Sequence, residues 1–171
     1  MSRFLSAPLA MVACMVCTGA AQAITPGQVD DFQDGTTQGW QHGGPSPAPP
    51  INSADNGPLG AGDHALFFEA SGSGGPGGRL VAFNRAQWTG DWTDAGITQV
   101  SMDVQNLSGQ PITLRLGIDG PGGRFASSFG VFHPASMTGY LPVTFFVEDI
   151  DWVADPGNAT PDIDATLAAV S

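Results

Sequence analysis

The chain has 171 residues, which is enough for one domain with a hydrophobic core and short for two. Five basic residues stand against 16 acidic ones, so the formal net charge is -11 and the surface repels phosphate backbones and anionic lipid, which excludes nucleic acid as a partner. The 24 Gly and 14 Pro disfavour helix and supply turns, which indicates a protein built from strands.

The first 23 residues have the pattern of a secretory signal peptide. Arg3 precedes an apolar run that ends in the small-residue motif Ala-Gln-Ala, which predicts cleavage after Ala23. A lipoprotein signal that uses Cys14 is the weaker alternative, because the apolar run before it is very short. Cleavage after Ala23 leaves one domain, 24–171, without Cys. Since no second apolar stretch approaches the roughly 20 residues of a membrane helix, we expect a secreted protein, extracellular or periplasmic, with no membrane span.

Alternating apolar and polar residues predict seven strands. A strand at 30–33 comes first, and a loop rich in Pro and Gly follows it over 43–62. The remaining predicted strands lie at 65–70, 79–84, 97–107, 111–119, 124–133 and 141–147. Helix is expected only in turns, around 85–88 and 165–170.

The alternation is cleanest in 97–107 and 111–119, which we expect to form a hairpin across the short loop NLSGQ. One wet face of this hairpin would carry Asp103, Gln105, Thr113 and Arg115. Arg115 and Asp103 would then form either an ordinary cross-strand ion pair or part of a sugar-binding groove. Antiparallel strands with one buried and one wet face predict an all-β, antiparallel two-sheet sandwich.

Two stretches, DDFQDGTTQGW at 30–40 and GDHALFFEA at 62–70, resemble the first strand, turn and second strand of carbohydrate-binding modules with the galactose-binding-like jelly-roll fold. The chain after the signal also looks like exported, Gly-rich, single-domain bacterial proteins of this fold. The resemblance implies a jelly-roll sandwich that binds a glycan. Jelly rolls have eight strands and seven are predicted here, so we expect either a seven-stranded variant or a chain that lacks its last strand, with a sheet edge open near the first strand.

The same resemblance implies a structural calcium ion between the first strand and the loop before the second. Its ligands in this sequence would be Asp31, Gln33 and Asp63. Two features depart from the family pattern: Gln33 stands where an acid is usual, and the acid expected on the last strand is absent.

The motif WTGD at 88–91 resembles a segment of jelly-roll modules and of the laminin IV type domain that packs across the end of the sandwich. It implies that Trp88 closes the core. Trp92 lies between Asp91 and Asp94, and an exposed Trp beside carboxylates can meet the apolar face and the hydroxyls of a sugar together. Trp92 is therefore interpreted either as a core residue or as a stacking ring.

Catalytic motifs are weak, and we expect that the protein is not an enzyme. GSGGPG at 72–77 matches a dinucleotide-binding fingerprint by letter, but it contains a proline and leads into a strand instead of a helix. The three His are scattered, and no thiol remains after cleavage of the signal. A carboxylate pair for glycoside hydrolysis fits the spacing, but 16 acids make a close pair expected by chance.

These observations favour a secreted protein that binds a polysaccharide or surface glycan without catalysis. Trp92 would stack on a sugar ring. The residues expected to exchange hydrogen bonds with its hydroxyls are Asp91, Asp94, Arg115 and Asp103. The alternative is a structural protein of the cell exterior with no small ligand, and a glycan-cleaving enzyme is third. Two aromatic rings exposed in one hollow would distinguish the binding module from the structural protein.

Overall fold

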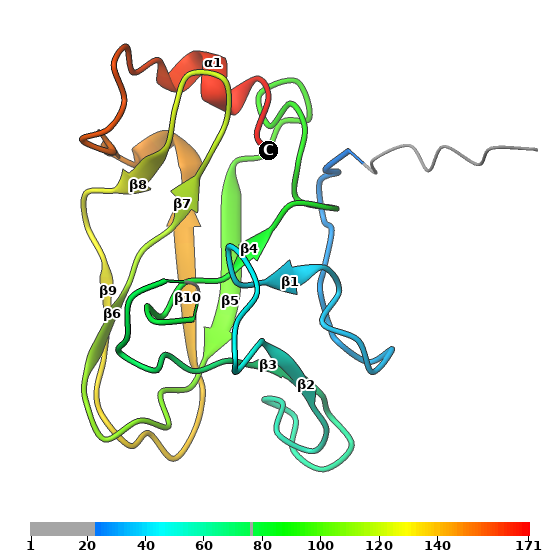
Figure 1. Cartoon of the computed structure of the whole chain (residues 1–171). Coiled ribbons are helices and arrows are strands. Elements are labelled where there is room, and N and C mark those ends of the chain that lie inside the picture. Colours follow the sequence, from blue (N-terminus) through cyan, green and yellow to red (C-terminus); the bar gives the residue numbers. More distant parts are fainter. Residues whose placement is uncertain (1–22, 76) are drawn as a thin grey trace, which may run out of the picture.

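The computed structural model describes residues 23–75 and 77–171 (Figure 1). Nearly all of the predicted signal peptide lies outside the described residues. The described chain has short strands in small antiparallel sheets, and its helices are η1 (Val147–Asp149) and α1 (Ile163–Leu167), which confirms an all-β protein. The strands are β1 (Trp40–Gln41), β2 (Ile51–Ser53), β3 (Ala65–Phe67), β4 (Phe83–Asn84), β5 (Gln99–Val104), β6 (Ile112–Leu114), β7 (Gly117–Ile118), β8 (Phe125–Ser127), β9 (Val131–His133), β10 (Leu141–Phe146) and β11 (Trp152–Ala154).

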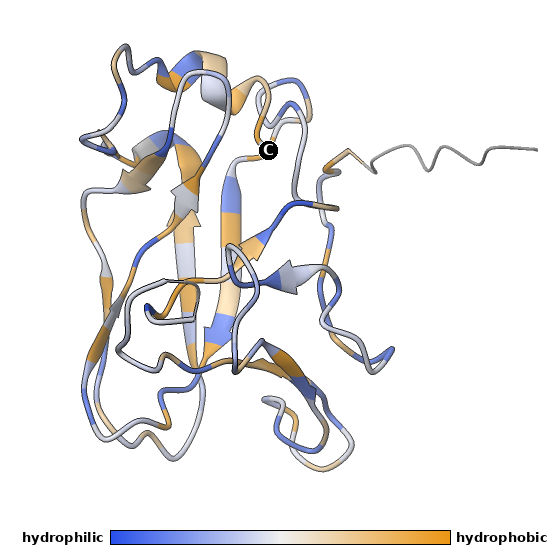
Figure 2. Cartoon of the chain, viewed as in Figure 1, coloured by the Kyte–Doolittle hydropathy of each residue, from blue (hydrophilic) through white to orange (hydrophobic). Residues whose placement is uncertain are grey.

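The longest strands, β5 and β10, form an antiparallel pair. Their register joins Val104 to Leu141 at one end and Gln99 to Phe146 at the other. Successive side chains of a strand point to opposite faces, so hydropathy alternates along both strands (Figure 2). Phe145 points inward and is fully buried. One face of the pair therefore forms a wall of the core.

A second layer of strands covers this inner face. β6 pairs with β9, and β8 pairs with both β7 and β11. Leu114 of β6, Val131 of β9 and Trp152 of β11 pack against the cluster around Phe145. The core thus lies between two layers of antiparallel strands.

Two further sheets, β1 with β4 and β2 with β3, belong to the N-terminal half of the chain. In the view of Figure 1 they lie to the right of β5, whereas β6 and β9 lie to its left. Each of their strands is only two or three residues long. This half therefore has few backbone hydrogen bonds between strands, and side-chain hydrogen bonds hold much of it in place.

The carboxylate of Asp30 links the N-terminal segment to the segment after β4 by hydrogen bonds. Its Oδ2 accepts hydrogen bonds from the indole Nε1 of Trp40 and of Trp88, both at 2.6 Å, and its Oδ1 accepts one from the Gln87 amide. The centroids of the two indole rings lie 6.5 Å apart. Hydrogen bonds to a charged acceptor are stronger than those between neutral groups, so one half-buried carboxylate holds three side chains.

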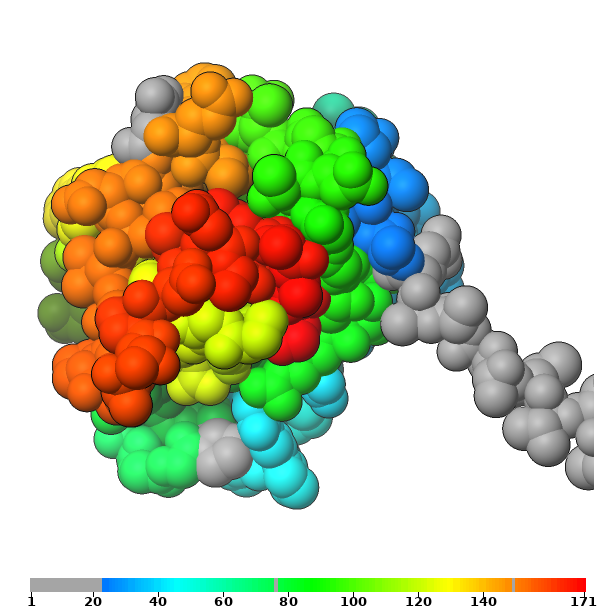
Figure 3. Space-filling view, turned by 90° about the horizontal axis from the view of Figure 1, so that it is seen from above, coloured from blue at the N-terminus to red at the C-terminus, as the bar shows by residue number. Residues whose placement is uncertain are grey.

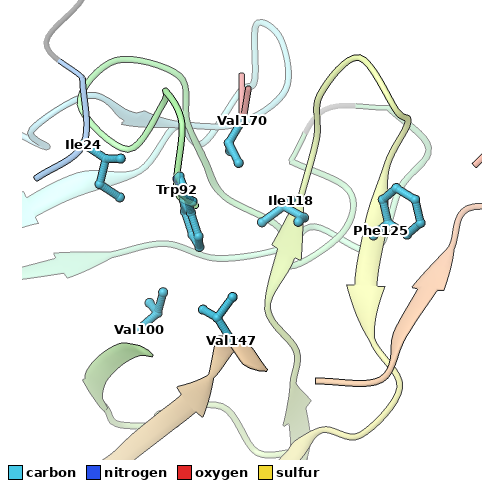
Figure 4. Close-up of a cluster of buried hydrophobic side chains, with 7 residues drawn as sticks. All are labelled: Ile24, Trp92, Val100, Ile118, Phe125, Val147 and Val170. Atoms are coloured by element: carbon cyan, nitrogen blue, oxygen red, sulfur yellow. The ribbon is translucent and has the colours of Figure 1, made fainter. Parts of the chain in front are cut away.

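Segments from three parts of the chain close the end of the core beside α1. The backbone N–H of Trp92 donates to the Leu167 carbonyl oxygen at 2.9 Å, and Gly90 forms an antiparallel bridge with Val170. Ile24 lies in the same buried cluster as Trp92 and Val170 (Figure 4). The beginning, middle and end of the described chain therefore share one cluster.

The strand predicted at 30–33 is not formed. Phe32 has a φ of 60°, a left-handed conformation that interrupts an extended strand. Local side chains also take the backbone donors: the Phe32 N–H donates to Gln38 Oε1, and the Gln33 N–H donates to Asp31 Oδ1. The first strand is instead β1.

The hairpin predicted between 97–107 and 111–119 is also wrong. β5 pairs with β10, and β6 pairs with β9, so the loop NLSGQ carries the chain from one layer to the other. A loop of this length can make either connection, and the alternation of residues is the same in both. β5 and β6 consequently do not share the wet face that the hairpin implied.

The other predicted strands are present but shorter. The segments 111–119 and 124–133 each contain two strands separated by a break. β2 lies inside the predicted loop 43–62, and β11 was not predicted. α1 overlaps the expected helical turn at 165–170, and no helix in the described ranges combines the length and apolar character needed to cross a membrane.

We predict that Asp30→Ala lowers the free energy of unfolding by about 2–3 kcal/mol, because two indole N–H groups and one amide lose their acceptor. Urea unfolding followed by tryptophan fluorescence measures the change. Glu69→Ala, which removes an exposed carboxylate, is the control and should change stability by less than about 0.5 kcal/mol. Equal unfolding midpoints for the two variants would show that the Asp30 contacts do not stabilise the fold.

His133 of β9 is fully buried, and neither ring nitrogen has a hydrogen-bond partner among the described residues. An unpaired buried polar group costs about 1–3 kcal/mol. We therefore expect His133→Leu to leave stability unchanged or to raise it by about 1 kcal/mol, as measured by thermal unfolding with circular dichroism. A melting temperature lowered by several degrees would instead show that the imidazole is paired in solution.

Candidate functional site

Trp92, the ring expected to stack on a sugar, is 4% exposed and belongs to the core. Its Nε1 donates to the Trp88 carbonyl oxygen at 3.0 Å, and its ring lies in the cluster shown in Figure 4. The prediction of an exposed stacking ring is therefore wrong. The physical reason is local: Asp91 and Asp94 take the exposed positions of the turn, and Trp92 between them points inward.

Trp88 packs against the core, as the resemblance of the WTGD motif implied. It packs against the same buried cluster as Trp92, and its indole N–H is occupied by the Asp30 carboxylate. Trp40 contacts Trp88 and shares that acceptor. The indole N–H of each of these three rings is therefore occupied within the fold, and the Trp92 ring is buried as well.

A shallow hollow of about 780 Å³ lies where the segment after β4 meets the C-terminal residues. Figure 3 looks down on this end of the molecule, with the segment after β4 in green beside the C-terminal residues in red. The hollow is lined by Arg85, Thr89, Gly90, Asp91, Asp119 and residues 168–171. A smaller hollow of about 70 Å³ shares Arg85 and is lined also by Gln41, His42, Gly43, Gly44 and Phe83.

The larger hollow contains an acceptor and a donor that are both charged and free among the described residues. Asp91 Oδ1 accepts from the Asp94 N–H at 2.7 Å, and Asp91 Oδ2 has no hydrogen-bond partner within the described ranges. The Arg85 guanidinium carbon lies 5.3 Å from the centre of the Phe83 ring, and the described residues supply no carboxylate that pairs with it. A carboxylate only accepts and a guanidinium only donates, so together they can bind hydroxyl groups in both senses.

The Asp119 carboxylate, by contrast, is already hydrogen-bonded through both of its oxygens. Its Oδ2 accepts from Arg124 Nη2 at 2.8 Å and from Nε at 3.3 Å, and its Oδ1 accepts from the Gly120 N–H at 3.1 Å. This hydrogen bonding, together with the opposite charge of the carboxylate, raises the pKa of Arg124. Asp119 therefore forms part of the wall of the hollow, and Asp91 and Arg85 are the charged lining residues that keep unpaired groups within the described ranges.

The other predicted ligand residues do not gather at this hollow. Asp94 is exposed beside Asp91 but does not line it. Arg115 donates to the two backbone carbonyl oxygens at 127–128, so the ion pair predicted between Arg115 and Asp103 is wrong. Asp103 lies on the exposed face of β5. Of the predicted set, the structure keeps only Asp91 at the hollow, and it adds Arg85, which no motif singled out.

The three residues expected to bind calcium do come together. Gln33 Nε2 donates to Asp63 Oδ1 at 2.8 Å and to the Asp31 carbonyl oxygen at 3.3 Å. Gln38 donates to Asp31 Oδ1, and the Leu59 N–H donates to Asp63 Oδ2. An amide N–H thus stands where calcium needs an oxygen, and the described ranges contain no cluster of three His, Cys, Asp or Glu side chains suited to a metal. The three residues therefore lie together as the resemblance implied, and the calcium site stays a prediction.

A search with family models, a search of curated proteins and a search of solved structures each found no match. The resemblance to galactose-binding-like modules therefore stays a prediction. The candidate site depends on the geometry and chemistry of the hollow beside Asp91.

We predict that Trp92→Ala lowers the free energy of unfolding by about 3–5 kcal/mol, the usual cost of removing a large buried aromatic ring. Phe146→Ala is the control, because that ring is 53% exposed on β10, and it should cost less than about 1 kcal/mol. Urea unfolding of both variants provides the comparison. A Trp92→Ala variant as stable as the unsubstituted protein would contradict the placement of this ring in the core.

Proposed function

We propose that this chain is a secreted, non-catalytic glycan-binding domain with a galactose-binding-like jelly-roll fold. Two layers of antiparallel strands around one core support the fold, and the sequence of the first 23 residues supports export. The hollow at the end of the core supports the binding of a glycan. The ligand-binding residues in this proposal are Asp91 and Arg85, in place of Trp92.

The pairing of a free acceptor with a free donor in one hollow is the observation that carries the proposal. Sugar hydroxyls both donate and accept hydrogen bonds, so they are matched by Asp91 Oδ2 and the Arg85 guanidinium, with Thr89 beside them. The hollow of about 780 Å³ is broadly open to solvent, so a sugar bound there would stay largely exposed. Because the formal net charge is -11, neutral glycans fit this surface better than acidic ones.

The lining of the hollow also limits the affinity. No aromatic ring is among the described residues that line it, so a sugar bound there gains hydrogen bonds without the stacking that strengthens many glycan complexes. Recognition of a chain end or of a single sugar unit, with weak affinity, follows from this composition.

The same observation favours the second candidate, a structural protein of the cell exterior. Such a protein needs no aromatic floor, and the most exposed rings, Phe132 at 62% and Phe146 at 53%, lie on strands outside the hollow. Glycan cleavage ranks third because it needs two working carboxylates. Asp119 already has both oxygens hydrogen-bonded, which leaves Asp91 alone.

Affinity electrophoresis through gels that contain neutral galactan, xylan or β-1,3-glucan tests the proposal. We expect retardation in one gel and a loss of affinity of about tenfold or more in Asp91→Asn and in Arg85→Gln, since each removes a charged hydrogen-bonding group. Asp94→Asn is the matched control, because this neighbouring carboxylate does not line the hollow, and it should migrate like the unsubstituted protein.

Three outcomes separate the candidates. Retardation lost in Asp91→Asn but kept in Asp94→Asn supports the binding module. Retardation that survives both substitutions moves the glycan site away from the hollow. A folded protein with no retardation in any gel puts the structural role first.

A further inference from the structure

Among the described residues, Ile24 is the first along the chain that enters the core. Ala23 and Thr25 on either side of it are exposed. The Ile24 side chain is 4% exposed and packs in the same buried cluster as Trp92 (Figure 4). Its backbone N–H donates to the Thr89 carbonyl oxygen at 2.9 Å. The side chain and the backbone of this one residue are therefore both held at the end of the core.

The residues that follow Ile24 stay beside the same part of the chain. Gln28 Nε2 donates to the Gln87 carbonyl oxygen at 2.9 Å. Asp30 Oδ2 accepts from the Trp88 indole N–H at 2.6 Å. The segment 24–30 is thus attached at several points to 87–89, and the position of Ile24 is fixed from the residues after it.

This boundary between exposed and buried residues coincides with the cleavage site that the sequence predicts. The motif Ala-Gln-Ala ends at Ala23, so cleavage there makes Ile24 the first residue and converts its amide nitrogen into an α-ammonium group. The two observations are independent, because the protease selects small residues before the cut and the core selects an apolar residue after it.

We propose that the α-ammonium group of Ile24 stays bound to the Thr89 carbonyl oxygen after cleavage. The mature N-terminus is then a charged part of the candidate site, in a chain that is exported and cleaved as proposed above, on which this inference rests. An ammonium group has three N–H donors, and one of them replaces the amide N–H. Loss of the exposed Ala23 opens the other two to water. Because charged donors form stronger hydrogen bonds than neutral ones, cleavage strengthens this contact.

The bound terminus contacts two residues that line the larger hollow. Thr89 and Gly90 both belong to its lining. The Ile24 nitrogen bonds to the first and lies 3.5 Å from the position that a Cβ of Gly90 would occupy. Gly90 also bridges to Val170, another lining residue. Attachment of the terminus therefore fixes one wall of the hollow and places a positive charge against it.

The composition of the chain makes this terminus easy to observe. The five basic residues are all Arg, and the sequence contains no Lys. The α-amino group is therefore the sole primary amine of the chain 24–171, and reagents that modify primary amines report on the terminus alone.

Mass spectrometry of the protein exported with its own signal peptide tests the cleavage site. We expect a product whose first residue is Ile24. A product that begins at another residue, or a chain that stays uncut, would overturn the proposal. The gels described above test glycan binding independently of this result.

The reactivity of the amine tests whether the terminus is bound. Reductive methylation at neutral pH is compared for 24–171 and for 23–171, whose amine lies on the exposed Ala23. We expect the folded 24–171 chain to react about fivefold more slowly, because its amine must first leave the Thr89 carbonyl oxygen. In guanidinium chloride the two chains should react at similar rates. Equal rates in the folded state would overturn the proposal.

Two substitutions in 24–171 test whether the core holds the terminus. Ile24→Ala removes the buried side chain and should raise the methylation rate of the folded chain several-fold, relative to its own rate in guanidinium chloride. Val29→Ala is the matched control, because Val29 is 74% exposed, and its rate should not change. A rate that Ile24→Ala leaves unchanged would overturn the proposal.

Acetylation of the amine tests the charge, because it removes the charge and keeps one N–H donor. We expect acetylation to lower the folding equilibrium constant of 24–171 about fivefold, as measured by urea unfolding. The same modification of 23–171 should have no effect, since its amine is one residue away from Thr89. Equal effects of acetylation on the two chains would overturn the proposal.

Discussion

The half-buried carboxylate of Asp30 is the contact on which the N-terminal half depends. This half has only two- and three-residue strands, which supply too few ladder hydrogen bonds to fix long loops against the core. Asp30 compensates by binding the indole N–H of Trp40 and Trp88 and the amide of Gln87. With Trp88 held, its neighbour Trp92 can enter the core, and Gly90 can meet the C-terminal segment. One carboxylate thus binds two indole rings directly, and Trp92 is linked to it through the Trp88 carbonyl oxygen.

The strands predicted best from sequence were those with long, clean alternation. β5 and β10 each run for six residues, and period-two patterns predict both because one face is buried and the other is wet. The segment at 30–33 has a similar pattern but forms no strand, because Asp31 and Gln38 offer its backbone N–H groups side-chain acceptors. Which strands pair with each other was not predictable. The NLSGQ loop is long enough either for a hairpin between β5 and β6 or for a crossover between the two layers, and the crossover forms because β5 pairs with β10 and β6 pairs with β9.

The candidate site was predictable only in part for a similar reason. Asp91 was identified as a carboxylate beside Trp92. Arg85 lies 6 residues before Asp91 and Asp119 lies 28 residues after it, and no motif connects the three before the chain folds. Trp92 shows the opposite error. Its polar neighbours indicated exposure, but in a tight turn adjacent residues point in different directions, and burial of one large ring beside two solvated carboxylates satisfies all three.

Pro142 has a consequence for the sheet that β5 and β10 form. A sheet with two open edges can add strands from both sides and grow into a fibre, as exposed edges do in amyloid. Pro142 lies at a position of β10 that faces away from β5, where it has no N–H to offer to a further strand. A strand that added to this edge of β10 would meet a gap in the hydrogen-bond ladder, so this one imino acid opposes open-ended growth of the sheet on that side.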